Sequence, residues 1–125
     1  MTTGAKTQIF NWLPTRLAEV AFRHGNEAAW RRAQAKEVIA VANSNGFATL
    51  GIEIWLPGSA GPRIPVPYFY GWTAPESESK GSQELCSKLN LAAADYIEHF
   101  GWDPLDLEHQ AQDPLFNLTF ELFEG

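Results

Sequence analysis

The clearest hydrophobic pattern in the chain is a strict alternation over residues 47–56. One set of alternate positions is apolar: Ala48, Leu50, Ile52, Ile54 and Leu56. The intervening set is mixed: Phe47, Thr49, Gly51, Glu53 and Trp55. Residues two apart share one face of a β-strand, so this stretch predicts a strand with one face in the core. A loop rich in proline and glycine, residues 57–62, ends it.

Two further segments have the period of a strand. Near the C-terminus, Phe116, Leu118, Phe120 and Leu122 alternate with Asn117, Thr119 and Glu121, which predicts a last strand. Residues 64–72 are less regular, because Pro65 and Pro67 restrict the first half to edge or polyproline-like geometry. The second half of this segment is predicted to be a strand.

The N-terminal third favours helices. Pro14 suits a helix start, so a short helix is expected over Thr15–His24, with Gly25 as its stop. Asn26 is a plausible N-cap for a second, alanine-rich helix that runs to about Asn43. The end of that helix, residues 38–41, also fits a strand joined to the next by a turn at 43–46, but the unbroken alanine-rich run favours helix.

A third helix is predicted between Ser82, a good N-cap, and Gly101. Its expected apolar stripe is Leu85, Leu89, Ala92, Tyr96 and Phe100, with spacings of three and four. The predicted order is therefore α-α-β-β-α-β. We expect an α+β fold with a small, mostly antiparallel sheet of about three or more strands and helices packed on one face. Residues 1–125 are expected to form one domain, with 1–13 as a loose lead-in from which Ile9, Phe10, Trp12 and Leu13 pack onto it.

Composition limits the class of protein and its expected location in the cell. The 125 residues are 45% hydrophobic and 13% aromatic, which is typical of a globular chain with a sizeable core. The N-terminus does not resemble a secretory leader, and no apolar run reaches the roughly 18–20 residues that span a membrane. Cys86 is the only cysteine, so no intramolecular disulfide can form. These features predict a cytoplasmic protein that does not enter a membrane.

Charge is distributed unevenly along the chain. The net charge is −6; residues 1–52 hold six Lys/Arg and three Asp/Glu, whereas residues 53–125 hold three and twelve. An acidic surface repels phosphates, which disfavours nucleic acids and anionic membranes as partners. A basic protein partner is favoured instead.

The sequence contains no arrangement typical of catalysis. It has no nucleophile elbow and no phosphate-binding glycine motif, and its histidines, His24, His99 and His109, lack the i, i+4 spacing of helical metal ligands. His99 fits a helix-capping role, and Cys86 fits a small buried thiol. We therefore predict that the protein is not an enzyme and binds no metal or cofactor.

The acidic connection between the third helix and the last strand has two interpretations. Its acids are Asp103, Asp106, Glu108 and Asp113, and they lack the regular spacing and glycine of a metal-binding loop. They form either a solvated face or an acidic contact patch.

Aromatic and acidic side chains are the candidate partner-binding residues. Glu53 and Trp55 share one face of the strand over 47–56, and an exposed tryptophan beside a carboxylate is typical of an interface. Tyr68, Tyr70 and Trp72 would share one face of the next strand, where they either cover the core or anchor a partner. Glu76 and Glu78 would add charge at the rim.

The run Leu50-Gly51-Ile52-Glu53-Ile54-Trp55 resembles a family of immunity proteins from bacterial polymorphic toxin systems. The same family pattern has a proline-containing aromatic segment, here Ile64 to Trp72, a helix with a Tyr-Ile-x-x-Phe end, here Tyr96 to Phe100, and a final apolar strand. The resemblance covers about residues 28–123. It implies a small α+β protein that neutralises a cognate toxin domain by binding it, with no catalytic residues.

Two hypotheses from other classes stay open at this point. One is a small-molecule-binding or regulatory domain with a pocket lined by Tyr68 and Trp72. The other is a small enzyme whose site combines Glu53, His99 and His109, which requires these groups to lie within reach of one substrate.

Overall fold

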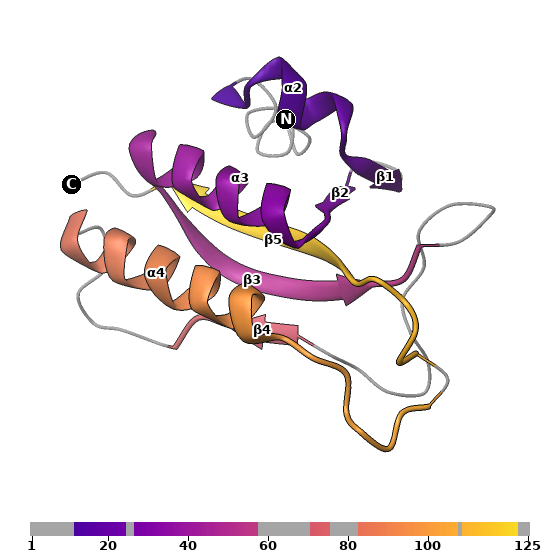
Figure 1. Cartoon of the computed structure of the whole chain (residues 1–125). Coiled ribbons are helices and arrows are strands. Elements are labelled where there is room, and N and C mark those ends of the chain that lie inside the picture. The colour runs from indigo at the N-terminus through magenta and orange to yellow at the C-terminus, as the bar shows by residue number, and fades with distance from the viewer. Residues whose placement is uncertain (1–11, 25–26, 58–70, 76–82, 108, 123–125) are drawn as a thin grey trace.

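A computed structural model describes residues 12–24, 27–57, 71–75, 83–107 and 109–122 of the protein. Within these residues the elements follow the order α2 (Thr15–Glu19), β1 (Phe22–His24), β2 (Glu27–Trp30), α3 (Arg32–Ser44), β3 (Phe47–Trp55), β4 (Gly71–Thr73), α4 (Gln83–His99) and β5 (Leu115–Leu122). The five strands form one antiparallel sheet, and α3 and α4 lie side by side on one face of it (Figure 1). The predicted α+β class, with an antiparallel sheet and helices packed against it, is confirmed.

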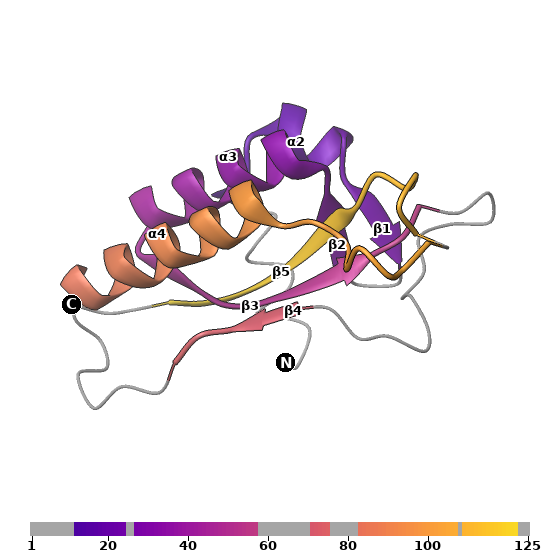
Figure 2. The ribbon, with the colours of Figure 1, turned by 60° about the horizontal axis from the view of Figure 1, so that its bottom comes forward.

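The C-terminal strand lies in the centre of the sheet. The strand order is β1-β2-β5-β3-β4, so β5 pairs with β2 on one side and with β3 on the other. The long β3–β5 ladder carries an irregularity between Thr49 and Gly51, where one extra residue on β3 shifts the register. The helices and the sheet form two layers (Figure 2).

The main core fills the space between these layers. Alternate residues of β3 and β5 supply its sheet side, and α3 and α4 supply its helix side. Its buried members include Ile52, Ile54, Phe116 and Leu118 from the strands and Val38, Ile39, Ala93 and Ile97 from the helices. The alternation in the two long strands therefore predicted the buried face of the sheet correctly over most of its length.

Two predicted helices are partly wrong, because residues 22–24 and 27–30 form paired antiparallel strands, a β-hairpin. The first helix ends at Glu19, and Phe22–His24 is a strand; the second begins only at Arg32, after the strand Glu27–Trp30. Alanines give residues 28–29 a helical propensity, but both are buried in the sheet, where their small side chains fit. Tertiary packing overrides the propensity here.

The rest of the helix α3 agrees with the prediction, including residues 38–41. Gly46 follows the helix with a φ of 80°, a left-handed conformation that suits glycine at a helix end. In α4 the predicted stripe is displaced: Cys86, Leu89, Ala93 and Ile97 are buried, whereas Ala92 is exposed. No helix among the described residues is long and apolar enough to cross a membrane.

The segment around α2 closes one end of the core. Trp12 and Leu13 pack against the main core, as expected for that part of the lead-in. Leu17 of α2 is buried, and its carbonyl oxygen accepts a hydrogen bond from Trp30 Nε1 at 2.8 Å. This buried bond ties α2 to β2.

Candidate functional site

A hollow of about 410 Å³ lies in the face of the sheet that points away from α3 and α4. Its polar and glycine lining consists of Glu27 of β2, Gly51 and Glu53 of β3, Gly71 and Thr73 of β4, and Asn117 and Thr119 of β5. These residues alternate with core residues such as Ile52 and Leu118, so they point to the opposite side of the sheet. The polar residues that alternate with apolar ones in β5, Asn117 and Thr119, are therefore the sequence feature that indicates this site.

Two rows of paired residues explain the shape of the hollow. Gly71, Glu53 and Asn117 are neighbours across three strands, and so are Thr73, Gly51 and Thr119. The two glycines leave room where larger side chains would stand. A Cβ atom at Gly51 would come no closer than 3.7 Å to its nearest neighbour, so the glycine provides space and is not required by a close approach.

Glu53 is half-buried and fixed in direction. Trp55 Nε1 donates a hydrogen bond to Glu53 Oε1 at 2.8 Å. Trp55 itself is only 3% exposed and packs with Ala29 and Leu115, while the ring of His24 stands edge-on to it. The prediction that Trp55 is exposed at an interface is therefore wrong. The β1–β2 hairpin, which the sequence patterns did not indicate, brings the residues that bury it.

The other side of the hollow is built from β5 and β2. Asn117 is 5% exposed, and its Nδ2 donates to the carbonyl oxygen of Ala28 at 2.9 Å, which ties the two strands together. Glu27 is exposed and begins β2. The lining thus contains two carboxylates, Glu27 and Glu53, and no Lys or Arg among the residues that the structure describes. The charge of this lining favours a cationic group over an anionic one.

Of the remaining predicted partner-binding residues, Trp72 borders the hollow and the others lie outside the described part of the chain. Trp72 of β4 is paired with Ile52 and packs against the main core, which supports its role as a core cover. Tyr68, Tyr70, Glu76 and Glu78 lie outside the described residues. Trp72 is the one aromatic residue in the described lining of the hollow, and Tyr68, the other aromatic residue expected in such a pocket, lies outside the described residues.

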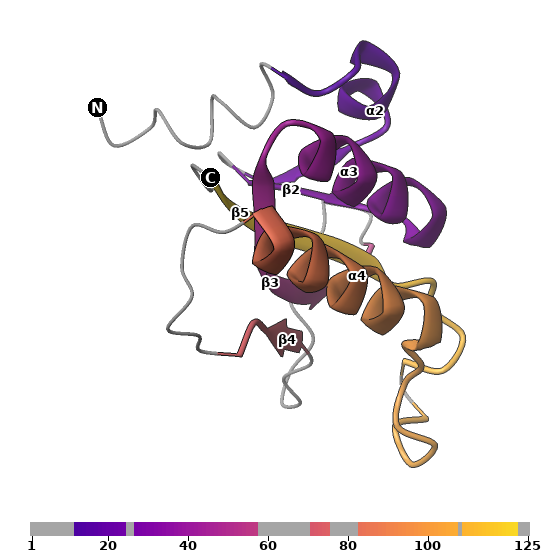
Figure 3. The same cartoon turned by 90° about the vertical axis from the view of Figure 1, so that its left-hand side faces the viewer.

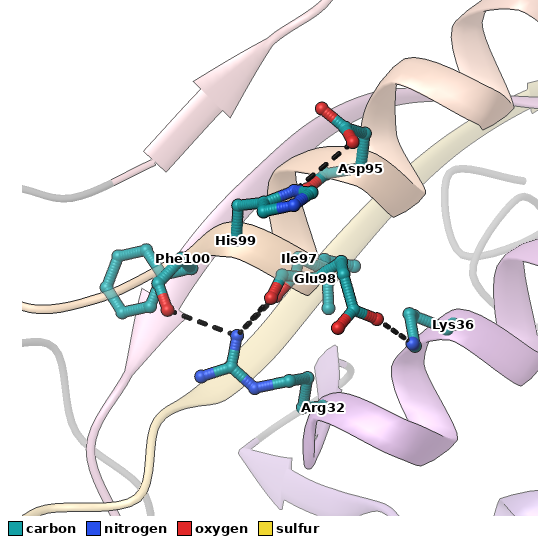
Figure 4. Close-up of polar contacts among 7 residues, drawn as sticks. All are labelled: Arg32, Lys36, Asp95, Ile97, Glu98, His99 and Phe100. Carbon is teal, nitrogen blue, oxygen red and sulfur yellow. Dashed lines mark hydrogen bonds and ion pairs between the residues drawn. The ribbon is translucent and has the colours of Figure 1, made fainter.

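A second hollow, of about 420 Å³, lies at the C-terminal end of α4. It is lined by Asp95, Tyr96, His99, Phe100 and Gly101. His99 is exposed and its Nδ1 lies 3.2 Å from Asp95 Oδ1, one helical turn earlier (Figure 4). Burial raises the pKa of the Tyr96 phenol.

Two cationic side chains from α3 contact the C-terminal end of α4 (Figure 4). Arg32 Nη1 donates to the carbonyl oxygens of Ile97 and Phe100, at 2.5 and 3.1 Å. Lys36 pairs with the Glu98 carboxylate, and this hydrogen-bonded cation lowers the pKa of Glu98. Cations are favourable at the C-terminus of a helix, so we interpret this cluster as a structural cap.

The other candidate reactive groups are dispersed. Cys86 is 1% exposed, and burial raises the pKa of its thiol, which disfavours the reactive thiolate. His99 lies 13 residues further along the same helix, about 20 Å away by the helical rise, so it does not serve Cys86 as a base. Within the described residues, no group of three or more His, Cys, Asp or Glu could hold a metal ion.

His109 and Asp106 form a buried pair in the connection between α4 and β5. His109 Nδ1 lies 2.8 Å from Asp106 Oδ2, and the two residues are 0% and 5% exposed. The interpretation of this acidic connection as a uniformly solvated face is therefore wrong for Asp106. Glu53 in the sheet hollow, the exposed His99 and the buried His109 occupy three different environments and do not share a described pocket.

No protein-family model, curated protein or solved structure matches the chain significantly. Geometry and charge favour the sheet-face hollow as the candidate site.

Proposed function

We propose that the protein is an immunity protein of a bacterial polymorphic toxin system, which binds a basic toxin domain and blocks it by occupying its surface. The observation that carries this proposal is the hollow in the sheet face, where Glu27 and Glu53 stand without a described basic neighbour in the lining. A lysine or arginine of the partner would complement the charge of these two carboxylates.

The distribution of ion pairs supports a partner of this charge. Arg31 pairs with Asp113 at 2.6 Å, and Arg16 pairs with Glu37 at the same distance. Arg32 and Lys36 are engaged at the end of α4. These cations are engaged within the molecule, so they do not repel a basic partner as free charges would. Two of them pair with acids of residues 53–125, Asp113 and Glu98, and the net charge of −6 remains to favour such a partner.

The hollow is also preorganised. Trp55 fixes the direction of Glu53, and the bond from Asn117 to β2 fixes the floor between β5 and β2. A site whose side chains are already ordered loses less entropy when it binds. The resemblance to immunity proteins begins at residues 50–55, which are the part of β3 that contributes Gly51 and Glu53 to the hollow. The protein would act in the cytoplasm, where it protects the cell that makes it.

The test is co-expression with the C-terminal domain encoded directly upstream of this gene. We expect that domain to be toxic alone and wild-type protein to restore growth. The double variant Glu27→Gln/Glu53→Gln should bind about tenfold more weakly or worse, because two charges at the contact are removed. Calorimetry of the purified proteins measures this, and the wild-type affinity should fall as salt is added.

The matched control is Glu19→Gln/Glu84→Gln, which removes the same charge from exposed positions on α2 and α4. It should bind like the wild type. A non-toxic upstream domain, or toxicity that wild-type protein does not relieve, contradicts the proposed function. Equal affinities for the hollow variant and the wild type would exclude the sheet face as the site.

A further inference from the structure

Two leucines protrude from the loop that joins α4 to β5. Leu105 and Leu107 are 88% and 81% exposed, the highest values among the large hydrophobic residues in the described part of the chain. The loop projects from the end of the molecule where α4 ends (Figure 3). Two strongly exposed leucines only two residues apart on a protruding segment favour an interaction site.

Internal hydrogen bonds hold this loop in place. Asp106, between the two leucines, turns inward to the buried His109, and its backbone N–H donates to Asp103 O at 2.8 Å. Trp102 Nε1 donates to Gln112 O at 2.9 Å, which joins the two ends of the loop. The buried pair and the crossing bond thus fix the backbone on which the leucines are displayed.

The loop is also fastened to the sheet. Asp113 pairs with Arg31 next to β2, and β5 begins two residues later. Asn117 of the sheet hollow is four residues beyond Asp113, which is about 13 Å along an extended chain. A partner that covers the hollow therefore also lies close to the end of the loop at Asp113.

We infer that the loop is a second contact with the toxin domain, in which Leu105 and Leu107 enter an apolar recess bordered by lysine or arginine side chains. This inference rests on the proposed function. The charge of the recess follows from the sequence of residues 103–113, which has four acids and no Lys or Arg. Asp106 and Asp113 are engaged by His109 and Arg31, which leaves Asp103 and Glu108 as the acids next to the leucines in the sequence. Two copies of this loop repel each other, so a basic partner fits better than a second copy of the chain.

The experiment is a calorimetric titration of the upstream-encoded toxin domain with the variant Leu105→Ser/Leu107→Ser. We expect its Kd to be at least about tenfold higher than that of the wild type, since two apolar contacts are lost. Its unfolding temperature should stay unchanged, because both side chains are already in water. Leu91→Ser is the matched control: Leu91 is 72% exposed on α4. It should leave the Kd unchanged.

The outcomes separate the two proposals. If the double leucine variant binds like the wild type, this inference is overturned while the proposed function stands. If the wild type does not bind the domain, both are overturned. If sedimentation shows that the wild type dimerises and the leucine variant does not, the partner of the loop is a second copy, and the inference is likewise overturned.

Discussion

At the scale of single residues, the side chain of Arg32 contacts more than one element of the fold. It begins α3, yet its guanidinium group donates to carbonyl oxygens at the end of α4 and lies over the ring of Phe116 in β5, 5.7 Å from its centroid. A planar group with several donors can satisfy more than one of the carbonyls that a helix end leaves unbonded. One side chain therefore joins both helices to the central strand.

We predict that Arg32→Ala lowers the free energy of unfolding by about 2 kcal/mol, because charge-assisted hydrogen bonds and a cation–π contact are lost together. Arg32→Lys should be intermediate, since lysine keeps the charge but not the fork of donors. Urea denaturation followed by tryptophan fluorescence measures both. Lys36→Ala, which removes only an exposed ion pair next to it, is the control and should change stability little. Equal losses in Arg32→Ala and Lys36→Ala would contradict this account.

At the scale of elements, Asn90 of α4 supports the irregular part of β3. Its Oδ1 accepts hydrogen bonds from the Thr49 N–H and hydroxyl, at 2.8 and 2.7 Å, and its Nδ2 donates to Asn43 Oδ1 and Phe47 O, both at 2.9 Å. The register shift after Thr49 interrupts the ladder there. Thr49 is fully buried, so water does not reach its backbone N–H and its hydroxyl. A side chain must accept their hydrogen bonds instead.

Asn90→Leu should lower the free energy of unfolding by about 3 kcal/mol, because several buried polar groups lose their partners at once. Hydrogen exchange at the Thr49 amide should become faster by more than at other β3 amides. The control is Asn45→Ala, an exposed asparagine with one bond to a helix carbonyl, which should cost less than about 1 kcal/mol. Unchanged exchange at Thr49 would show that Asn90 does not support this bend.

The elements also show where sequence patterns were sufficient. Long amphipathic stretches, β3, α3, α4 and β5, were predicted because their burial repeats over several turns or residue pairs. The hairpin at residues 22–30 was missed because its strands have only three and four residues. Gly25-Asn26, two residues between the paired His24 and Glu27, is the hairpin spacing that would have indicated it.

The candidate site was predicted only in part for the same reason. Glu53 was identified from its place in an apolar strand, and it does line the hollow. Glu27, on the missed hairpin, and Asn117, on a strand distant in sequence, join it only because the sheet order places β2, β5 and β3 side by side. That order depends on long-range pairing, which local patterns do not encode.

For the whole molecule, the central position of the last strand has the largest consequence. β5 separates β2 from β3, and its residues Leu115 and Phe116 are fully buried. Without β5 the β1–β2 hairpin loses its connection to the rest of the sheet. The pair β1–β2 and the pair β3–β4 are therefore joined into one sheet only when β5 is folded between them.

We predict that a chain ending at Pro114 does not fold. Removal of Leu115, Phe116 and Leu118 from the core costs about 2–5 kcal/mol for each large side chain, which together exceeds the usual stability of a domain of this size. Circular dichroism should show no cooperative thermal transition, and a peptide of residues 115–125 added in trans should restore one. Leu122→Ala, at the exposed end of the same strand, should keep the transition near that of the wild type, since Leu122 is 49% exposed. Cooperative unfolding of the shortened chain alone would mean that the helices and the remaining strands form a stable core without their central strand.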